Sequence, residues 1–196
     1  MNQLLIVFFI LVTTGVIAQL RVIKSTSETN TITYEILSKM DKYEIRSYPD
    51  LTVATTELER SSYSEMARTG FSRIASYIFG KNSSGKKISM TSPVKMDMSD
   101  SSSMSFYLPP EYLISELPVP DRSDVRIQVE PAKKVAVIQF SGWASKKVLE
   151  SKFEELKTLL EEEQLKYEDS YSYLGYNPPY QLINRRNEVI VKLINQ

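Results

Sequence analysis

Two stretches of the chain place apolar residues at the spacing of an amphipathic helix. In the first stretch the apolar positions follow one another at i, i+4, i+7 and i+11, and they are Ala67, Phe71, Ile74 and Ile78. Because Ser62 and Glu65 form a capping box just before them, we expect a helix from residue 62 to residue 79. A second helix is expected after Ser145 and up to about Gln164, with a run of Lys and Glu side chains on a solvated face.

Around these helices, apolar runs bounded by Gly, Pro, Asn and Ser predict about nine strands. The expected strands are 34–37, 43–48, 51–57, 87–98, 103–108, 125–130, 135–142, 170–174 and 188–193. About nine strands and two helices indicate an α+β fold, a distorted β-barrel or twisted antiparallel sheet that is flanked by the two helices.

The pattern occurs twice, at an offset of 82 residues. Segment 45–54 matches segment 127–136 in its apolar positions and in the proline at its centre, and helix positions 67–78 match positions 149–160. Each half therefore has the order strand, proline-containing turn, strand, helix and further strands. This internal repeat predicts a domain built from two pseudo-repeated α+β halves.

The first residues have the pattern of a targeting segment rather than of a folded element. An apolar run from Leu4 to Val12 is followed by the small residues Val16 and Ala18, which are spaced as a signal peptidase site. We therefore expect a signal peptide at 1–18, an N-terminal extension at 19–33 and a single domain at 34–194. The alternative is an uncleaved membrane anchor, since no Lys or Arg precedes the apolar run.

Cleavage would place the protein outside the cell or in the lumen of the secretory pathway, without membrane attachment and, we expect, as a monomer. In that compartment the sequon that begins at Asn82 predicts a glycoprotein.

Composition removes most catalytic classes. The chain has 196 residues, with 24 basic and 24 acidic side chains, so no broad positive field favours nucleic acid. It contains no His and no Cys, which excludes a Ser-His-Asp triad, His or Cys metal ligands, a thiolate nucleophile and disulfides. Ser92 and Lys95 match an S-x-x-K motif, but Pro93 in a strand-like stretch denies them adjacent helical turns. We expect a protein that is not an enzyme.

Soft and aromatic side chains gather in two segments. Four methionines lie within fifteen residues, at Met90, Met96, Met98 and Met104. They form either an inward strand face or an adaptable apolar wall for a large flat ligand. Four tyrosines flank the Asn-Pro-Pro segment 177–179, at Tyr171, Tyr173, Tyr176 and Tyr180. They either pack locally or stack on a planar ligand.

Six motifs occur in an order that resembles the SOUL family of haem-binding proteins. They are Tyr-Glu-Ile-Arg-Ser-Tyr-Pro at 43–49, Ile-Ser-Met-Thr-Ser-Pro-Val at 88–94, Phe-Tyr-Leu-Pro at 106–109, Phe-Ser-Gly at 140–142, Gly-Tyr-Asn-Pro-Pro at 175–179 and Arg-Arg-Asn-Glu-Val at 185–189. The resemblance covers about residues 34–193. It implies a distorted β-barrel made of two similar halves and non-enzymatic binding of haem or another porphyrin on an apolar surface near the first helix.

The resemblance also implies ligand-binding residues. Arg68 matches a basic position suited to a haem propionate, and Phe71 and Ala75 follow it on one helix face. Tyr176 matches the aromatic residue of the Gly-Tyr-x-Pro-Pro loop. Phe71 also lies on the expected core stripe, so a core role stays open. The axial His of some members has no counterpart, and the metal ligand is left open between Tyr and Met.

The sequence thus predicts a secreted tetrapyrrole binder that acts as a carrier, scavenger or buffer without His ligation. The alternative is a binding module for another apolar small ligand or for a protein partner on the same scaffold.

Overall fold

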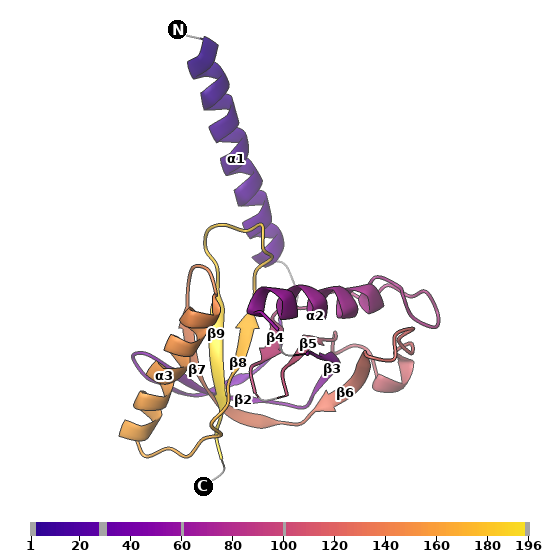
Figure 1. Ribbon diagram of the computed structural model, residues 1–196, viewed down its shortest axis with the longest axis vertical. Coiled ribbons are helices and arrows are strands. Elements are labelled where there is room, and N and C mark those ends of the chain that lie inside the picture. Colours follow the sequence, from indigo (N-terminus) through magenta and orange to yellow (C-terminus); the bar gives the residue numbers. More distant parts are fainter. Residues whose placement is uncertain (1–2, 28–30, 60, 100, 195–196) are drawn as a thin grey trace.

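The computed structural model describes residues 3–27, 31–59, 61–99 and 101–194 (Figure 1). The helices are α1 (Gln3–Ser27), α2 (Tyr63–Ile78), α3 (Lys146–Glu162) and the short 3-10 helix η1 (Ile114–Glu116). The strands are β1 (Glu35–Lys39), β2 (Glu44–Tyr48), β3 (Leu51–Glu57), β4 (Val94–Asp97), β5 (Ser103–Tyr107), β6 (Arg126–Glu130), β7 (Lys133–Phe140), β8 (Ser172–Gly175) and β9 (Asn187–Lys192).

Within the described residues, nine strands form one antiparallel sheet in the order β1-β2-β7-β9-β8-β4-β5-β3-β6. The sheet curls into a half-barrel, with α2 and α3 packed against it and α1 extending away from it (Figure 1). The α+β prediction, with a twisted antiparallel sheet flanked by two helices, is confirmed.

The two halves of the sheet mirror each other in order. In this comparison β2, β3, β4 and β5 correspond to β6, β7, β8 and β9. When each strand is replaced by its counterpart, the order from β2 to β6 becomes the same order read backwards. The first residues of β2 and β6, and those of β3 and β7, are separated by the 82-residue offset of the repeat. Near both ends of this order, a strand of one half pairs with a strand of the other half. These pairs are β2 with β7 and β3 with β6.

Helices α2 and α3 begin at the capping residues that the sequence predicted. The Ser62 hydroxyl accepts a hydrogen bond from the Glu65 amide, and the Ser145 hydroxyl accepts one from the Val148 amide. These contacts satisfy amide groups that have no partner inside the helix. One expected strand, 87–98, is shorter than predicted, since only its last part forms β4. Pro93 lies just before β4 and cannot donate to the sheet ladder, which is consistent with this boundary.

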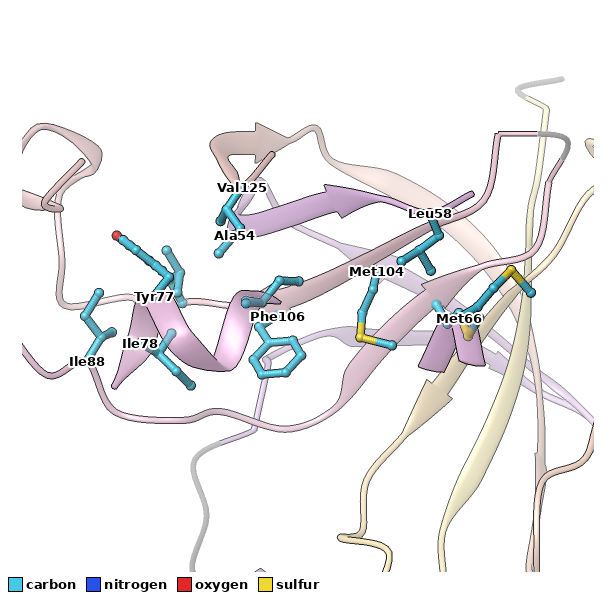
Figure 2. Packing of buried hydrophobic residues seen from close by; sticks show 12 residues of the cluster. Ala54, Leu58, Met66, Tyr77, Ile78, Ile88, Met104, Phe106 and Val125 are labelled. Carbon is cyan, nitrogen blue, oxygen red and sulfur yellow. The ribbon is translucent and has the colours of Figure 1, made fainter. Parts of the chain in front are cut away.

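Each helix covers its own apolar cluster on the outer face of the sheet. Figure 2 shows residues of α2, such as Met66 and Ile78, facing Met104 and Phe106 of β5. The second cluster joins α3 to β7 and β9, and its buried members include Leu149, Leu156, Ala136, Ile138 and Val189. The helix stripes found in the sequence therefore are core stripes.

The inner face of the sheet carries a third buried cluster. Strand alternation points its side chains away from the two helices. Its members are Ile32, Tyr48, Val53, Tyr107, Val135, Val137, Leu174, Tyr176 and Ile190. Buried apolar side chains therefore lie on both faces of the sheet.

Helix α1 contains the expected signal segment 1–18, apart from its first two residues, and continues beyond Ala18 to Ser27. Among the described residues, no helix has the length and apolarity needed to cross a membrane. Cleavage after Ala18, with the domain division built on it, stays a prediction.

Asn82, the predicted glycosylation site, has a different part in the fold. Only 5% of the residue is exposed, and its amide donates to the carbonyl oxygens of Tyr77 and Lys86 at 3.0 and 2.8 Å. Its side-chain oxygen accepts from the Lys86 amide at 3.1 Å. The side chain thus closes the loop that follows α2, and a glycan on Nδ2 would displace one of its donor bonds.

We expect the folded protein to carry no glycan at Asn82, so that treatment of protein from a eukaryotic secretion host with peptide N-glycosidase leaves its intact mass unchanged. Replacing Asn82 by alanine should lower the free energy of unfolding by about 1–3 kcal/mol, because buried loop groups lose their partners. Ser84→Ala removes the same sequon and should cost far less. A mass loss on glycosidase treatment would contradict the expectation.

Candidate functional site

Three of the four predicted ligand-binding residues lie together on α2. Arg68 is exposed, Phe71 is 40% exposed and Ala75 is 7% exposed. The Phe71 ring packs against the ring of Phe106 with centroids 5.2 Å apart, so one side of it belongs to the core and the other faces solvent. Phe71 therefore makes a core contact, while its role in ligand binding stays a prediction.

This flank of α2 continues as an apolar strip. Phe79, at the end of the helix, is 60% exposed. The segment that leads into β4 starts beside the same helix end, where the Ile88 amide donates to the Ile78 carbonyl oxygen at 2.9 Å. Met90, two residues farther along, is 38% exposed. Exposed aromatic and thioether groups near a guanidinium suit a flat apolar ligand that carries a carboxylate.

Tyr176, the fourth predicted residue, lies elsewhere. Its ring belongs to the inner-face cluster, with the Arg186 guanidinium 4.0 Å from the ring centroid. Its hydroxyl donates to Glu188 Oε2 at 2.9 Å, and burial, followed by the charge of Glu188, raises the pKa of this phenol well above its usual value. The structure does not bring Tyr176 together with the three residues of α2.

Glu188 is the centre of an ion network on the inner face. Its side chain is fully buried and accepts from Arg46 Nη1 at 3.0 Å and from Arg186 Nη2 at 2.7 Å. Arg46 also pairs with Glu44 at 2.7 Å and lies 4.3 Å from the ring centroid of Tyr34. Every charge in this network has a partner, so the network joins β2 to β9 and offers no free group to a ligand.

The loop between β8 and β9 exposes apolar side chains, two of which sequence reasoning missed. Tyr180, Leu182 and Ile183 are 64, 57 and 54% exposed. The sequence selected Tyr180 among the tyrosines that flank the Asn-Pro-Pro segment, but Leu182 and Ile183 lack helical or strand periodicity, so no pattern selected them. Apolar residues in a segment that the sequence assigns to a loop are the signal that could have found them. Figure 1 shows this loop rising beside the N-terminal end of α2 and the base of α1.

Arg185 holds this loop in shape. Its Nη1 donates to the carbonyl oxygens of Pro178 and Gln181 at 2.8 and 2.7 Å, and its guanidinium lies 4.5 Å from the ring centroid of Trp143. Trp143 is 56% exposed, so the apolar surface continues beyond the loop. Burial raises the pKa of the phenol of Tyr63, the first residue of α2, and the nearby charge of Arg185 opposes this rise. The loop base and the start of α2 are therefore neighbours.

The end of α1 packs on the same loop. Gln19 donates to the Tyr180 carbonyl oxygen at 3.2 Å and accepts from the Leu182 amide at 3.0 Å. The Thr26 hydroxyl donates to Gln181 Oε1 at 2.9 Å. These contacts come from residues on the carboxyl side of the expected cleavage point.

The described residues contain no group of three or more acidic side chains placed to hold a metal ion. The sequence has no His or Cys. The choice between Tyr and Met as an iron ligand therefore stays open.

The arrangement defines a class: an antiparallel α+β half-barrel with two outer helices, one of which presents an exposed apolar flank and a basic side chain. The family model described as SOUL heme-binding protein matches residues 29–192, and the chain belongs to this family. Human "Heme-binding protein 2" is 33% identical over 156 residues, which are 75% of this chain and 76% of that protein. "Heme-binding protein 1" of Sus scrofa is 30% identical over 168 residues, 80% of this chain and 88% of that protein.

Solved structures show the same fold at low sequence identity. The C-terminal domain of EcmrR has a TM-score of 0.60 at 10% identity, and the match covers 84% of this chain and all of that one. A hydrolase from Listeria innocua has a TM-score of 0.55 at 11% identity, covering 81% of this chain and 94% of that one. At this identity the likeness concerns the fold alone.

Proposed function

We propose that this protein binds haem or another tetrapyrrole as a carrier, scavenger or buffer, without a His ligand. Membership of the SOUL family supports tetrapyrrole binding as the class of function. The observation that carries the proposal is the exposed flank of α2, where the exposed Arg68 precedes the half-exposed Phe71 by about one turn and Phe79 exposes further apolar area at the end of the helix.

The ligand would lie with its ring against this flank and against the exposed side chains of the β8–β9 loop. Arg68 would pair with a propionate, and such a pair between a guanidinium and a carboxylate gives orientation as well as affinity. An iron-containing tetrapyrrole would bring a metal centre to the site, and the residue that would hold this iron stays open between Tyr and Met. Because no His or Cys singles out the metal, ring burial and the propionate contact would dominate binding.

The secretory route is part of the proposal and rests on the apolar run that precedes Ala18. In that compartment a monomeric, non-enzymatic binder would keep a reactive porphyrin in solution. We propose no nucleic-acid partner, since the basic and acidic side chains are equal in number.

A second candidate function is binding of a different apolar ligand or of a protein. The observation that favours it is the β8–β9 loop, which places Tyr180, Leu182 and Ile183 in solvent. Contiguous exposed apolar side chains often mark an interaction surface.

The test is a visible absorbance titration with hemin and, separately, with protoporphyrin IX. We expect a saturable one-to-one Soret shift with both and affinities within about tenfold of each other, which is about 1.4 kcal/mol. Arg68→Ala should weaken binding about two- to fivefold, because an exposed ion pair contributes about 0.5–1 kcal/mol. Phe71→Ala should weaken it further through lost ring contact. Tyr176→Phe tests whether that hydroxyl also contributes.

Arg126→Ala is the matched control, since Arg126 is an exposed arginine on β6 whose partner is Glu57. It should leave both affinities unchanged. A hemin affinity a hundredfold tighter than that for protoporphyrin IX would show an iron ligand and overturn binding without metal selection. No Soret change with either compound would overturn tetrapyrrole binding and leave the second candidate.

A further inference from the structure

The inner face of the half-barrel contains a cavity of about 200 Å³ that the proposed function does not use. It lies where β4, the turn between β6 and β7, and strands β8 and β9 meet, and Lys95, Glu130 and Lys133 line it. None of the four residues predicted to bind the tetrapyrrole lines it. The inference drawn from this cavity is therefore independent of the proposed function.

Two ammonium groups in this cavity share one carboxylate oxygen. Lys95 Nζ donates to Glu130 Oε1 at 2.5 Å, and Lys133 Nζ donates to the same oxygen. The second oxygen, Glu130 Oε2, is buried and has no hydrogen-bond partner among the described residues. Each ammonium group has three donors, so this cluster leaves donors and one acceptor unused next to an open volume.

Burial and the neighbouring charge of Lys95 change the pKa of Lys133. Burial, followed by the charge of Lys95, lowers the pKa of the Lys133 ammonium below its ordinary value, and the opposing effects of Glu130 and Asp97 are smaller. Burial raises the pKa of Glu130, but the charges of Lys95 and Lys133 outweigh this and hold it below its ordinary value. Lys133 is thus the amine in this cluster that loses its proton more readily than a free lysine, while Glu130 stays ionised.

Other titratable groups surround the cluster from the neighbouring elements. They are Asp97 on β4, Tyr107 on β5, Glu168 and Tyr171 before β8, and Lys192 on β9. Lys192 pairs with Glu168 at 2.6 Å, and both side chains are about half exposed, so this pair lies at the solvent edge and is screened. Burial, and then the charge of Glu130, raises the pKa of Tyr107, which therefore stays protonated.

We propose that Lys133 is a nucleophilic amine that forms an imine with a small aldehyde or ketone in this cavity, with Glu130 as the group that moves the proton. The neutral amine adds to the carbonyl carbon, and the carbonyl electron pair goes to oxygen. Glu130 carries the first proton from the nitrogen to the alkoxide oxygen, which gives the carbinolamine. It then carries the second nitrogen proton to the carbinolamine hydroxyl, which leaves as water. The balance is one carbonyl compound and one amine giving one imine and one water, so no oxidant or reductant is needed.

The electrostatics of the cluster favour this product. A neutral imine at Lys133 removes one of the two positive charges that share Glu130 Oε1, and Lys95 and Glu130 remain as a one-to-one ion pair. The apolar side chains of Val135 and Ile190 line the same cavity and would contact the carbon chain of the carbonyl compound. A small aliphatic aldehyde fits both the volume and this lining.

The test is reductive trapping of the whole protein with propanal and cyanoborohydride at neutral pH, followed by peptide mass mapping. Lys134 is the internal control, because it is the next residue along the chain and is exposed. We expect Lys133 to be propylated severalfold faster than Lys134 at neutral pH, because the lowered pKa of Lys133 raises its fraction of neutral amine. The rate at Lys133 should also level off at a lower pH than the rate of a free lysine.

Lys95→Met should slow labelling of Lys133, since it removes the neighbouring positive charge, while the effect of burial remains. Lys147→Met, which removes an exposed lysine of α3 outside the cavity lining, should leave the rate unchanged. The pH profile of the unaltered protein needs no variant, so it tests the proposal even if Lys95→Met fails to fold. Labelling of Lys133 that is no faster than labelling of Lys134 would overturn the proposal, whatever the outcome of the porphyrin titration.

Discussion

Replacing Glu188 by alanine is expected to lower the free energy of unfolding by about 3–5 kcal/mol, the range for removing one partner of a buried ion pair. Glu188 is fully buried and accepts hydrogen bonds from Arg46, Arg186 and Tyr176. Without it, the Arg46 side chain, which is only 3% exposed, keeps a buried charge next to the smaller contribution of Glu44. The loss comes from this uncompensated guanidinium rather than from the net value of the pair.

Urea unfolding monitored by circular dichroism measures this loss. Glu155→Ala is the matched control, because Glu155 pairs with Lys152 on the exposed side of α3, and it should change stability by less than about 1 kcal/mol. A loss for Glu188→Ala as small as that of the control would show that water reaches the inner face and solvates Arg46.

Leu156→Ala is expected to cost about 2–5 kcal/mol, and Ile74→Ala a similar amount. Both side chains are 0% exposed, Leu156 in the cluster beneath α3 and Ile74 in the cluster beneath α2. Truncation leaves a cavity that the surrounding strands can only partly fill. The two residues occupy corresponding positions of the repeat, so they test whether the two halves are packed equally well.

The same denaturation experiment provides the measurement, with Thr158→Ala as the control. Thr158 lies on α3 with its hydroxyl donating to the Glu154 carbonyl oxygen in an exposed position, and its loss should be within about 0.5 kcal/mol. If either core variant lost less than about 1 kcal/mol, its helix would be only loosely docked on the sheet.

The helices and most strands could be predicted because their signals are local. The apolar spacing around Phe71 and the caps at Ser62 and Ser145 lie within a few residues of what they determine, and the structure confirms them. The ion network could not be predicted in this way, since Arg46 and Glu188 are 142 residues apart and no pattern pairs them. The predicted strand at 87–98 is too long. Its apolar alternation indicates a continuous strand, but β4 begins only after Pro93, which cannot donate to a sheet ladder.

In the candidate site too, local patterns predict some features, while others depend on contacts between distant residues. The family resemblance selected Arg68 and Phe71, and the local helix pattern predicted that both lie on one helix, whose surface they occupy in the structure. The same resemblance selected Tyr176, but strand alternation and the hydrogen bond to Glu188 turn this side chain to the inner face. The exposed residues of that loop, such as Leu182, follow from how Arg185 ties the backbone carbonyls, which is a tertiary property.

The crossed pairing of the halves has a consequence for folding. Since β2 pairs with β7, and β6 pairs with β3, each half of the chain donates a strand to the sheet of the other. A fragment that ends in the segment between β5 and β6 would therefore lack β6, a neighbour of β3, and β7, a neighbour of β2, while β2 would keep its pairing with β1. Such contacts between distant residues close long loops, which slows folding. The two halves of the chain thus form one cooperative unit, in which neither half can complete its part of the sheet before the other has been synthesised.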